Sequence, residues 1–273
     1  MLRWALIGAL FFTQTAFASP AKTLLGNSLT VSARSAVIVD AKSGKVLYEK
    51  NPGLKLPPAS TAKLMTVLVV LEKKSPREEV LIENSDTEVA TSKAGLTAGV
   101  KYNVGDLIMA TLIASSNDAA TALARHVAGT EDTFARLMNE KAAKLGMHDT
   151  HFVNATGLPD KQKNQYSTAG DLTKLLRYAY RDKRIDRVLE LMTIVIRGSD
   201  GKDIILKNHN KMLWKEPKFV KGKTGWTFAS RHTFVGTNFG IDKKIAFALL
   251  GSKEPWTDIR RLASFGLLLT NKR

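Results

Sequence analysis

The chain of 273 residues contains no cysteine. This absence excludes disulfide bonds, thiol nucleophiles and cysteine-ligated metal sites, so any chemistry must come from other side chains. Long apolar runs are also lacking: after the first few residues, no segment has the roughly 20 uncharged residues that cross a bilayer. We expect no metal site and no cofactor, because His148 and His151 form a His-x-x-His pair with no obvious third ligand.

Acidic residues are scarce. The chain has 41 Lys and Arg against 25 Asp and Glu, a formal net charge of +16. Such an excess favours an anionic neighbourhood, and we expect loose contact with anionic cell-wall polymer or a membrane surface. Nucleic acid is not expected as a partner, because the basic residues are spread along the chain without an aromatic-interleaved patch.

The N-terminus has the pattern of a secretory signal peptide. A short basic start, Met1 to Arg3, precedes an apolar run from Trp4 to Phe12 and a small-x-small site ending at Ala18. We expect residues 1–18 to be removed and residues 19–273 to act as a soluble periplasmic or otherwise extracytoplasmic domain.

Strand signals gather at the two ends of the chain, and helix signals fill the middle. The predicted strands combine β-rich runs with short turns, and they cover Ser35–Asp40, Lys45–Lys50, Lys218–Thr227, Arg231–Asn238 and Lys244–Gly251. The predicted helices have an apolar period near 3.6, and they run from Ser60 onwards and over Val104–Ala114, Asp118–Val127, Thr133–Leu145, Asp171–Tyr180 and Trp256–Leu269.

This order predicts an α/β (α+β) fold whose five-stranded antiparallel sheet is built from parts far apart in sequence. We expect flanking helices and a helical insertion, with the sheet subdomain over residues 30–74 and 200–273 and the helical subdomain over 75–199.

A serine and a lysine stand at the mouth of the first helix. Two prolines resist helix before Ser60, and the apolar run behind Lys63 is typical of a buried helix. Because Lys63 lies three positions after Ser60, the two side chains share a helix face, so the Lys63 amine can take the proton of the Ser60 hydroxyl. Taken alone, the pair is more typical of an N-cap serine and a solvated lysine, because N-cap serines are common.

Two further motifs occur once each. Ser115-Ser116-Asn117 falls at the break between two predicted helices, and Lys223-Thr224-Gly225 lies in a late strand. Taken alone, the Ser-Ser-Asn motif is typical of a turn between helices. The Lys-Thr-Gly motif, taken alone, is typical of a solvent-facing Lys-Thr pair beside a β-bulge. Together with Ser60 and Lys63, in this order, they form the signature of penicillin-binding proteins and class A β-lactamases.

The chain therefore resembles the low-molecular-mass penicillin-binding proteins, the serine D-alanyl-D-alanine carboxypeptidases and endopeptidases, which have a β-lactamase/transpeptidase-like fold. The resemblance extends over nearly the whole chain after the signal peptide. Besides the three motifs it includes Val39–Tyr48, Asn117–Ala120, Asn154–Pro159 and Lys221–Gly225.

The resemblance implies roles for these residues. Ser60 would be the nucleophile, Lys63 its general base, and Ser115 the proton relay to the leaving amine. Asn117, Lys223, Thr224 and Gly225 would bind substrate, and the backbone N–H groups of Ser60 and Trp226 would form the oxyanion hole. Burial and the second ammonium of Lys223 would lower the pKa of Lys63.

The substrates implied are peptidoglycan stem peptides, with β-lactams as covalent inhibitors. Carboxypeptidase is the expected activity and cross-link endopeptidase the alternative. A β-lactamase is disfavoured because the loop around Asn154 to Asp160 has no Glu, and a non-catalytic wall-binding protein because no motif is broken. Because 48 residues follow Gly225, we expect a bare catalytic domain without the C-terminal β domain and membrane anchor of many such carboxypeptidases. Two departures from the family pattern are Ser116, where Gly is frequent, and Gln165, where His often precedes Tyr-Ser-Thr.

Overall fold

The structure is a computed structural model that describes residues 29–240, 242 and 244–271. The expected signal peptide lies outside the described residues. None of the helices in the described part combines the length and apolar character needed to span a membrane.

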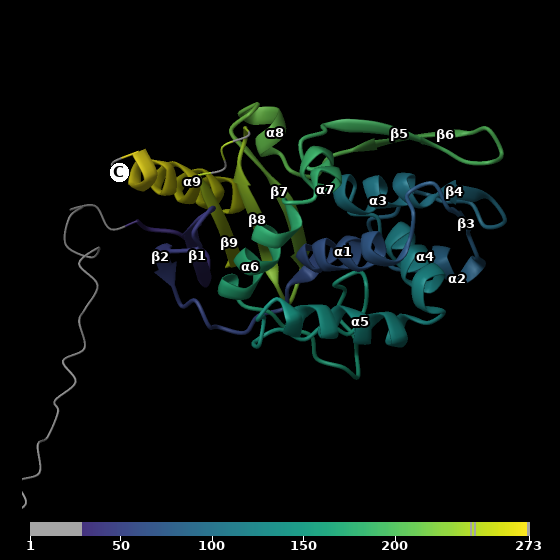
Figure 1. Ribbon diagram of the computed structural model, residues 1–273, viewed down its shortest axis with the longest axis horizontal. Coiled ribbons are helices and arrows are strands. Elements are labelled where there is room, and N and C mark those ends of the chain that lie inside the picture. The colour runs from purple at the N-terminus through teal and green to yellow at the C-terminus, as the bar shows by residue number, and fades with distance from the viewer. Residues whose placement is uncertain (1–28, 241, 243, 272–273) are drawn as a thin grey trace, which may run out of the picture.

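A five-stranded antiparallel sheet has the order β2-β1-β9-β8-β7 (Figure 1). Its strands are β1 Ser35–Asp40, β2 Val46–Lys50, β7 Val220–Thr227, β8 Arg231–Asn238 and β9 Ile245–Ser252. The N-terminal strand β1 pairs with the late strand β9, with Val37 opposite Ala248. The predicted antiparallel sheet of distant parts is thereby confirmed.

The two faces of the sheet bury different residues because side chains alternate along a strand. On β1, Ile38 belongs to an apolar cluster with Ile259 and Leu262 of α9 (Pro255–Asn271). Its neighbours Val37 and Val39 belong to the larger cluster that continues into the helical region. Strand β7 forms one edge of the sheet.

The helical region lies on the side of the sheet away from α9 (Figure 1). Its longer helices are α1 Lys63–Lys73, α3 Val104–Ile113, α4 Asn117–Ala128, α5 Glu131–Lys144 and α6 Ala169–Ala179. Short elements complete it, namely α2 Asn84–Thr87, α7 Lys183–Val188 and the strands β3 Glu79–Leu81, β4 Lys101–Asn103, β5 Thr193–Arg197 and β6 Asp203–Lys207. The short helix α8 Met212–Lys215 lies beside β7 (Figure 1), and its Met212 belongs to the apolar cluster of α9. Helix α1 runs through the centre, and residues 63–70 of it are buried.

The start of the first helix differs from the prediction. Ser60 lies in a 3₁₀ turn, Ala59–Ala62, and the α-helix begins only at Lys63. Ala59 has a φ of +49°, a conformation that costs an alanine energy, and Thr61 Oγ1 donates to Pro58 O at 2.6 Å. The chain therefore turns sharply before α1, and Ser60 is presented on that turn.

Candidate active site

Lys63 is fully buried at the start of α1, and its Nζ meets three oxygens. The Nζ lies 3.0 Å from Ser60 Oγ, 2.6 Å from Asn117 Oδ1 and 2.7 Å from the Thr156 carbonyl. Burial, and secondarily the charge of Lys223, lower the pKa of Lys63 well below its ordinary value. A neutral amine has two N–H groups and one lone pair. Because the two carbonyl oxygens can take both N–H groups, the lone pair is left for the Ser60 hydroxyl.

The amide of Asn117 is oriented by the chain that faces it. Its Nδ2 donates to the carbonyls of Ala90 at 2.8 Å and Thr91 at 2.7 Å, and its backbone N–H donates to Ser92 O at 2.7 Å. With both amide hydrogens used there, only Oδ1 can face Lys63. Thr91 and Ser92 hold left-handed φ values of +37° and +46°, so this segment is strained to reach Asn117.

A second buried lysine holds the other serine. Lys223 Nζ, on β7, donates to Ser115 Oγ at 2.8 Å and to Thr224 O at 3.0 Å. Burial lowers the pKa of Lys223 to about 7. Ser115 has a φ of +58° at the break between α3 and α4. The predicted turn thus directs Ser115 towards β7 while Asn117 reaches Lys63.

Gly225 lets β7 touch the turn that carries Ser60. A Cβ at Gly225 would lie 2.8 Å from the backbone N of Ser60 and 2.4 Å from Thr233 Oγ1. The adjacent strand β8 is tied to the same turn, since Thr233 Oγ1 donates to Pro58 O at 3.0 Å. Trp226, directly after Gly225, is half exposed.

The motifs did not identify the loop that supplies the third contact of Lys63. Asn154 Oδ1 accepts from Gly157 N at 2.8 Å and from Thr156 Oγ1 at 3.0 Å, and its Nδ2 donates to Leu158 O at 2.9 Å. Gly157 is needed there: its φ is +80°, and a Cβ would lie 1.9 Å from Ala59 O. The Asn-x-Thr-Gly pattern was the available signal, but the group in contact with Lys63 is a backbone carbonyl.

His209 is a second residue without a sequence signal. His209 keeps an exposed surface on the cleft, and partial burial, followed by the charges of Lys223 and Lys63, lowers its pKa below the ordinary value. Its backbone N–H donates to Ile113 O at 3.2 Å, which ties it to the end of α3, close to Ser115.

A cleft of about 940 Å³ opens over these residues. Ser60, Ser115, Thr224 and Trp226 line it, whereas Lys63 and Lys223 are buried behind its wall. Among the described residues that line it, none is Asp or Glu, and Lys207 and Lys211 supply positive charge. The cleft thus joins two serines, each in contact with a buried lysine, to a surface suited to anionic ligands.

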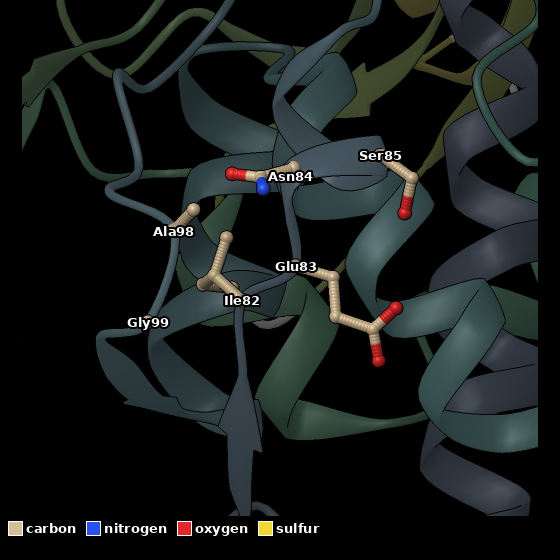
Figure 2. A pocket seen from close by; sticks show the side chains of 6 residues that line it. All are labelled: Ile82, Glu83, Asn84, Ser85, Ala98 and Gly99. Atoms are coloured by element: carbon tan, nitrogen blue, oxygen red, sulfur yellow. The ribbon is translucent and has the colours of Figure 1, made fainter.

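A separate hollow lies in the helical region between Glu83 and Gly99 (Figure 2). Glu83, whose side chain Figure 2 shows beside it, is paired with Arg125 at 2.7 Å. None of the predicted site residues lines this hollow. Within the described part of the chain, no cluster of three or more His, Asp or Glu side chains could hold a metal ion.

Known proteins match this arrangement in sequence and in fold. The sequence profile of the D-alanyl-D-alanine carboxypeptidase family matches residues 20–254. A D-alanyl-D-alanine carboxypeptidase of Mycobacterium tuberculosis is 30% identical over 87% of this chain and 83% of its own. A D-alanyl-D-alanine endopeptidase of Escherichia coli is 31% identical over 96% of this chain and 86% of its own. The solved structure of a penicillin-binding protein homolog from M. tuberculosis has a TM-score of 0.82 at 29% identity, covering 89% of this chain and 95% of that chain.

Proposed function

This chain belongs to the D-alanyl-D-alanine carboxypeptidase family and is a serine-type peptidase of that family, and we propose that Ser60 is its nucleophile and peptidoglycan stem peptides are its substrates. The observation that carries the assignment is Lys63 Nζ at 3.0 Å from Ser60 Oγ. That amine is buried and has a lowered pKa, as a general base for a serine requires.

In the acylation step, Ser60 Oγ attacks the carbonyl carbon between two D-alanines and Lys63 accepts the hydroxyl proton. The C–O ester bond forms and the amide C–N bond breaks. The leaving amine takes the proton that Lys63 accepted, relayed through Ser115, and Lys63 returns to its neutral form. Lys223 holds Ser115 with a hydrogen bond of 2.8 Å. Water then hydrolyses the ester and releases the shortened stem peptide.

The remaining residues bind the substrate around that bond. The backbone N–H groups of Ser60 and Trp226 stabilise the oxyanion, and Thr224 beside Gly225 takes the terminal carboxylate. The contact of Gly225 with the Ser60 turn supports this assignment, because it brings both N–H groups to one end of the cleft. Asn117, which the motif suggested as a substrate ligand, has both amide hydrogens on Ala90 and Thr91 and acts by orienting Lys63 through Oδ1.

Carboxypeptidase action on the terminal D-alanine is the expected main activity, as in the M. tuberculosis relative. The E. coli relative is named as an endopeptidase, so cleavage of cross-links is the second candidate. Mass spectrometry of wall fragments distinguishes the two: loss of one D-alanine from monomers marks carboxypeptidase, and conversion of dimers to monomers marks endopeptidase.

Covalent labelling tests the nucleophile. A labelled penicillin is expected to attach to Ser60, to stay bound for minutes or longer, and to leave folded Ser60→Ala unlabelled. A label mapped to Ser115 would refute the assignment.

The substrate class supports action outside the cytoplasm, and the signal-peptide pattern at residues 1–18 supports export. Moderate salt without detergent is expected to release the protein from cell fractions. Release by detergent alone, with residues 1–18 still attached, would show instead that they act as an anchor.

A further inference from the structure

Helix α5 brings a carboxylate to the loop that contacts Lys63. Glu131 is the first residue of α5, and its Oε1 accepts a hydrogen bond from the backbone N–H of Ala155 at 3.3 Å. Ala155 is fully buried and directly precedes Thr156, whose carbonyl accepts from Lys63 Nζ at 2.7 Å. The carboxylate therefore holds the loop one residue before the contact that directs the general base.

Ala155 is held through both of its backbone groups. Its carbonyl accepts from Thr66 Oγ1 of α1 at 2.6 Å, and its N–H donates to Glu131. Three residues earlier, the Asn139 side chain of α5 bonds both backbone groups of Phe152 at 2.8 Å. A buried N–H that loses its acceptor is unfavourable, so removal of the carboxylate should shift the loop away from its present position.

The charge of Glu131 also acts on the Lys63 amine. The titratable groups that face Lys63 are Lys223 on β7, Asp118 on α4, Glu131 on α5 and His209 after β6. Burial and the charge of Lys223 lower the pKa of Lys63, whereas the two carboxylates raise it. His209 is neutral near pH 7 because its own pKa is lowered. Glu131 is thus one of two anionic groups that offset the positive charge at the base.

Glu131 itself has charged neighbours on the outer side of the loop. Burial raises its pKa, the bond from Ala155 N lowers it, and the charges of Asp132 and Asp160 raise it again. Lys163, which pairs with Asp132 at 2.5 Å, lowers the pKa of Glu131. Glu131 is not among the described residues that line the cleft. It can therefore affect the reaction through the loop and through its charge, without touching a bound substrate.

We propose that Glu131 is a positioning residue of the proton-transfer centre: it fixes the Thr156 carbonyl on Lys63 and offsets part of the positive charge there. The inference rests on the proposed function, because it concerns the base that serves Ser60. The fixed carbonyl takes one N–H of the neutral amine, which keeps the lone pair of Lys63 directed at Ser60 Oγ.

The test compares pH profiles of penicillin acylation in the full chain. Glu131→Gln keeps an acceptor oxygen for Ala155 N and removes the charge. Its rising limb, set by Lys63, should move to lower pH by about 0.5 units or more, with the maximal rate within about threefold of the wild type. Glu131→Ala also removes the acceptor, and its maximal rate should fall at least tenfold. Glu140→Gln removes an exposed carboxylate from the same helix, and its profile should match the wild type.

A rising limb that stays in place in Glu131→Gln, or a wild-type maximal rate in Glu131→Ala, overturns the proposal. Rates lowered equally at every pH in both variants overturn it in favour of a purely structural role. A longer-lived penicilloyl ester in Glu131→Gln, with an unmoved rising limb, overturns it in favour of a carboxylate that activates water. In these three cases Ser60 of the wild type is still labelled, so the proposed function stands. If penicillin does not label Ser60 of the wild type, the proposed function and this inference both fail.

Discussion

Two lysines on β7, Lys221 and Lys223, show how the surroundings set the use of a residue. Both are buried, and they stand two positions apart on the same face of the strand. Lys221 Nζ faces carboxylates, with Asp186 Oδ1 at 2.8 Å and Glu190 as a second partner. Lys223 faces a hydroxyl and a carbonyl, and its pKa falls to about 7. Lys221 is therefore a structural ion pair between β7 and α7, whereas Lys223 can change its charge near neutral pH.

The first prediction concerns the pH dependence of penicillin acylation. Lys63 must be neutral to accept a proton, so activity rises with pH through its lowered pKa. Lys223 must be charged, so activity falls as pH rises through its pKa of about 7. The active form of the pair carries one proton, and the two limbs of the expected bell-shaped profile belong to the pair. Stopped-flow acylation rates between pH 5 and 10 measure it.

Two variants of Lys223 test the rising and the falling limb of the pH profile separately. Lys223→Gln removes a charge that lowers the pKa of Lys63, so the rising limb should move to higher pH and the falling limb should disappear. Lys223→Arg keeps the charge, so its rising limb should stay in place while the falling limb moves beyond pH 10. Identical profiles in the wild type and both variants would remove Lys223 from the mechanism.

At the scale of elements, the site depends on how closely β7 approaches the Ser60 turn. Gly225→Ala places a Cβ 2.8 Å from Ser60 N and 2.4 Å from Thr233 Oγ1, so the strand or the turn must shift. We expect penicillin acylation to fall at least 100-fold because the two oxyanion N–H groups separate. Gly53→Ala is the matched control, since nothing lies within 4 Å of its new Cβ. Normal acylation in Gly225→Ala would show that the close approach is dispensable.

The helix α4 also fixes the strained segment that orients Asn117. Buried Asp118 accepts from the backbone N–H groups of Ala94, Gly95 and Leu96 at 2.9, 3.0 and 3.2 Å. Asp118→Ala leaves these donors without their acceptor, so we expect a loss of about 3 kcal/mol in the free energy of unfolding.

Urea unfolding measures that loss, and slower acylation should accompany it because the carbonyls of Thr91 and Ala90 no longer hold Asn117. Asp118→Asn keeps one acceptor oxygen and should lose less. Equal urea midpoints for the wild type and Asp118→Ala would contradict the argument.

Local patterns predicted the long elements because their periodicity is strong. The five main strands and the longer helices lie within a few residues of their predicted ranges. The hairpin of β5 and β6 was missed, although Ile194 and Ile196 alternate with exposed residues and the Gly198-to-Gly201 turn follows. The 3₁₀ turn at Ser60 depends on a left-handed Ala59, which no propensity favours.

The site was predictable only where a side-chain motif marks it. Ser60, Lys63, Ser115, Asn117 and Lys223 meet as the motifs indicated. The contact of the Thr156 carbonyl with Lys63 was not predicted, and neither were the hydrogen bonds of the Asn154 side chain that hold its loop. A backbone group has no sequence motif of its own. Residues 207–214 carry no motif either, and tertiary contacts place them, among them the bond of Asn208 to Leu191 O and that of His209 N to Ile113 O.

At the scale of the whole molecule, the site joins distant parts of the chain. Lys63 is in α1, Asn117 opens α4, Thr156 lies in a loop and Lys223 is in β7. Lys63 meets Asn117 and Thr156 within the helical region, whereas Lys223 meets Ser115 only where β7 packs against the break between α3 and α4. Penicillin labelling of Ser60 should therefore report the folded state of the entire domain, in addition to the chemistry of one serine.

The last prediction follows from the net charge of the chain. A chain with a formal charge of +16 and no carboxylate among the described cleft residues should be drawn to anionic wall polymer over distances set by screening. The Debye length falls from ~30 Å at 0.01 M to ~10 Å at 0.1 M salt, so this attraction weakens strongly over that range. We expect salt to lower the activity on insoluble peptidoglycan several-fold while it changes the rate of penicillin acylation little, because a small inhibitor meets the buried Lys63 and Lys223 at close range. Parallel assays at the two salt concentrations measure both. Equal salt effects on polymer and penicillin would show that the charge acts within the cleft and contributes nothing to attraction by the wall.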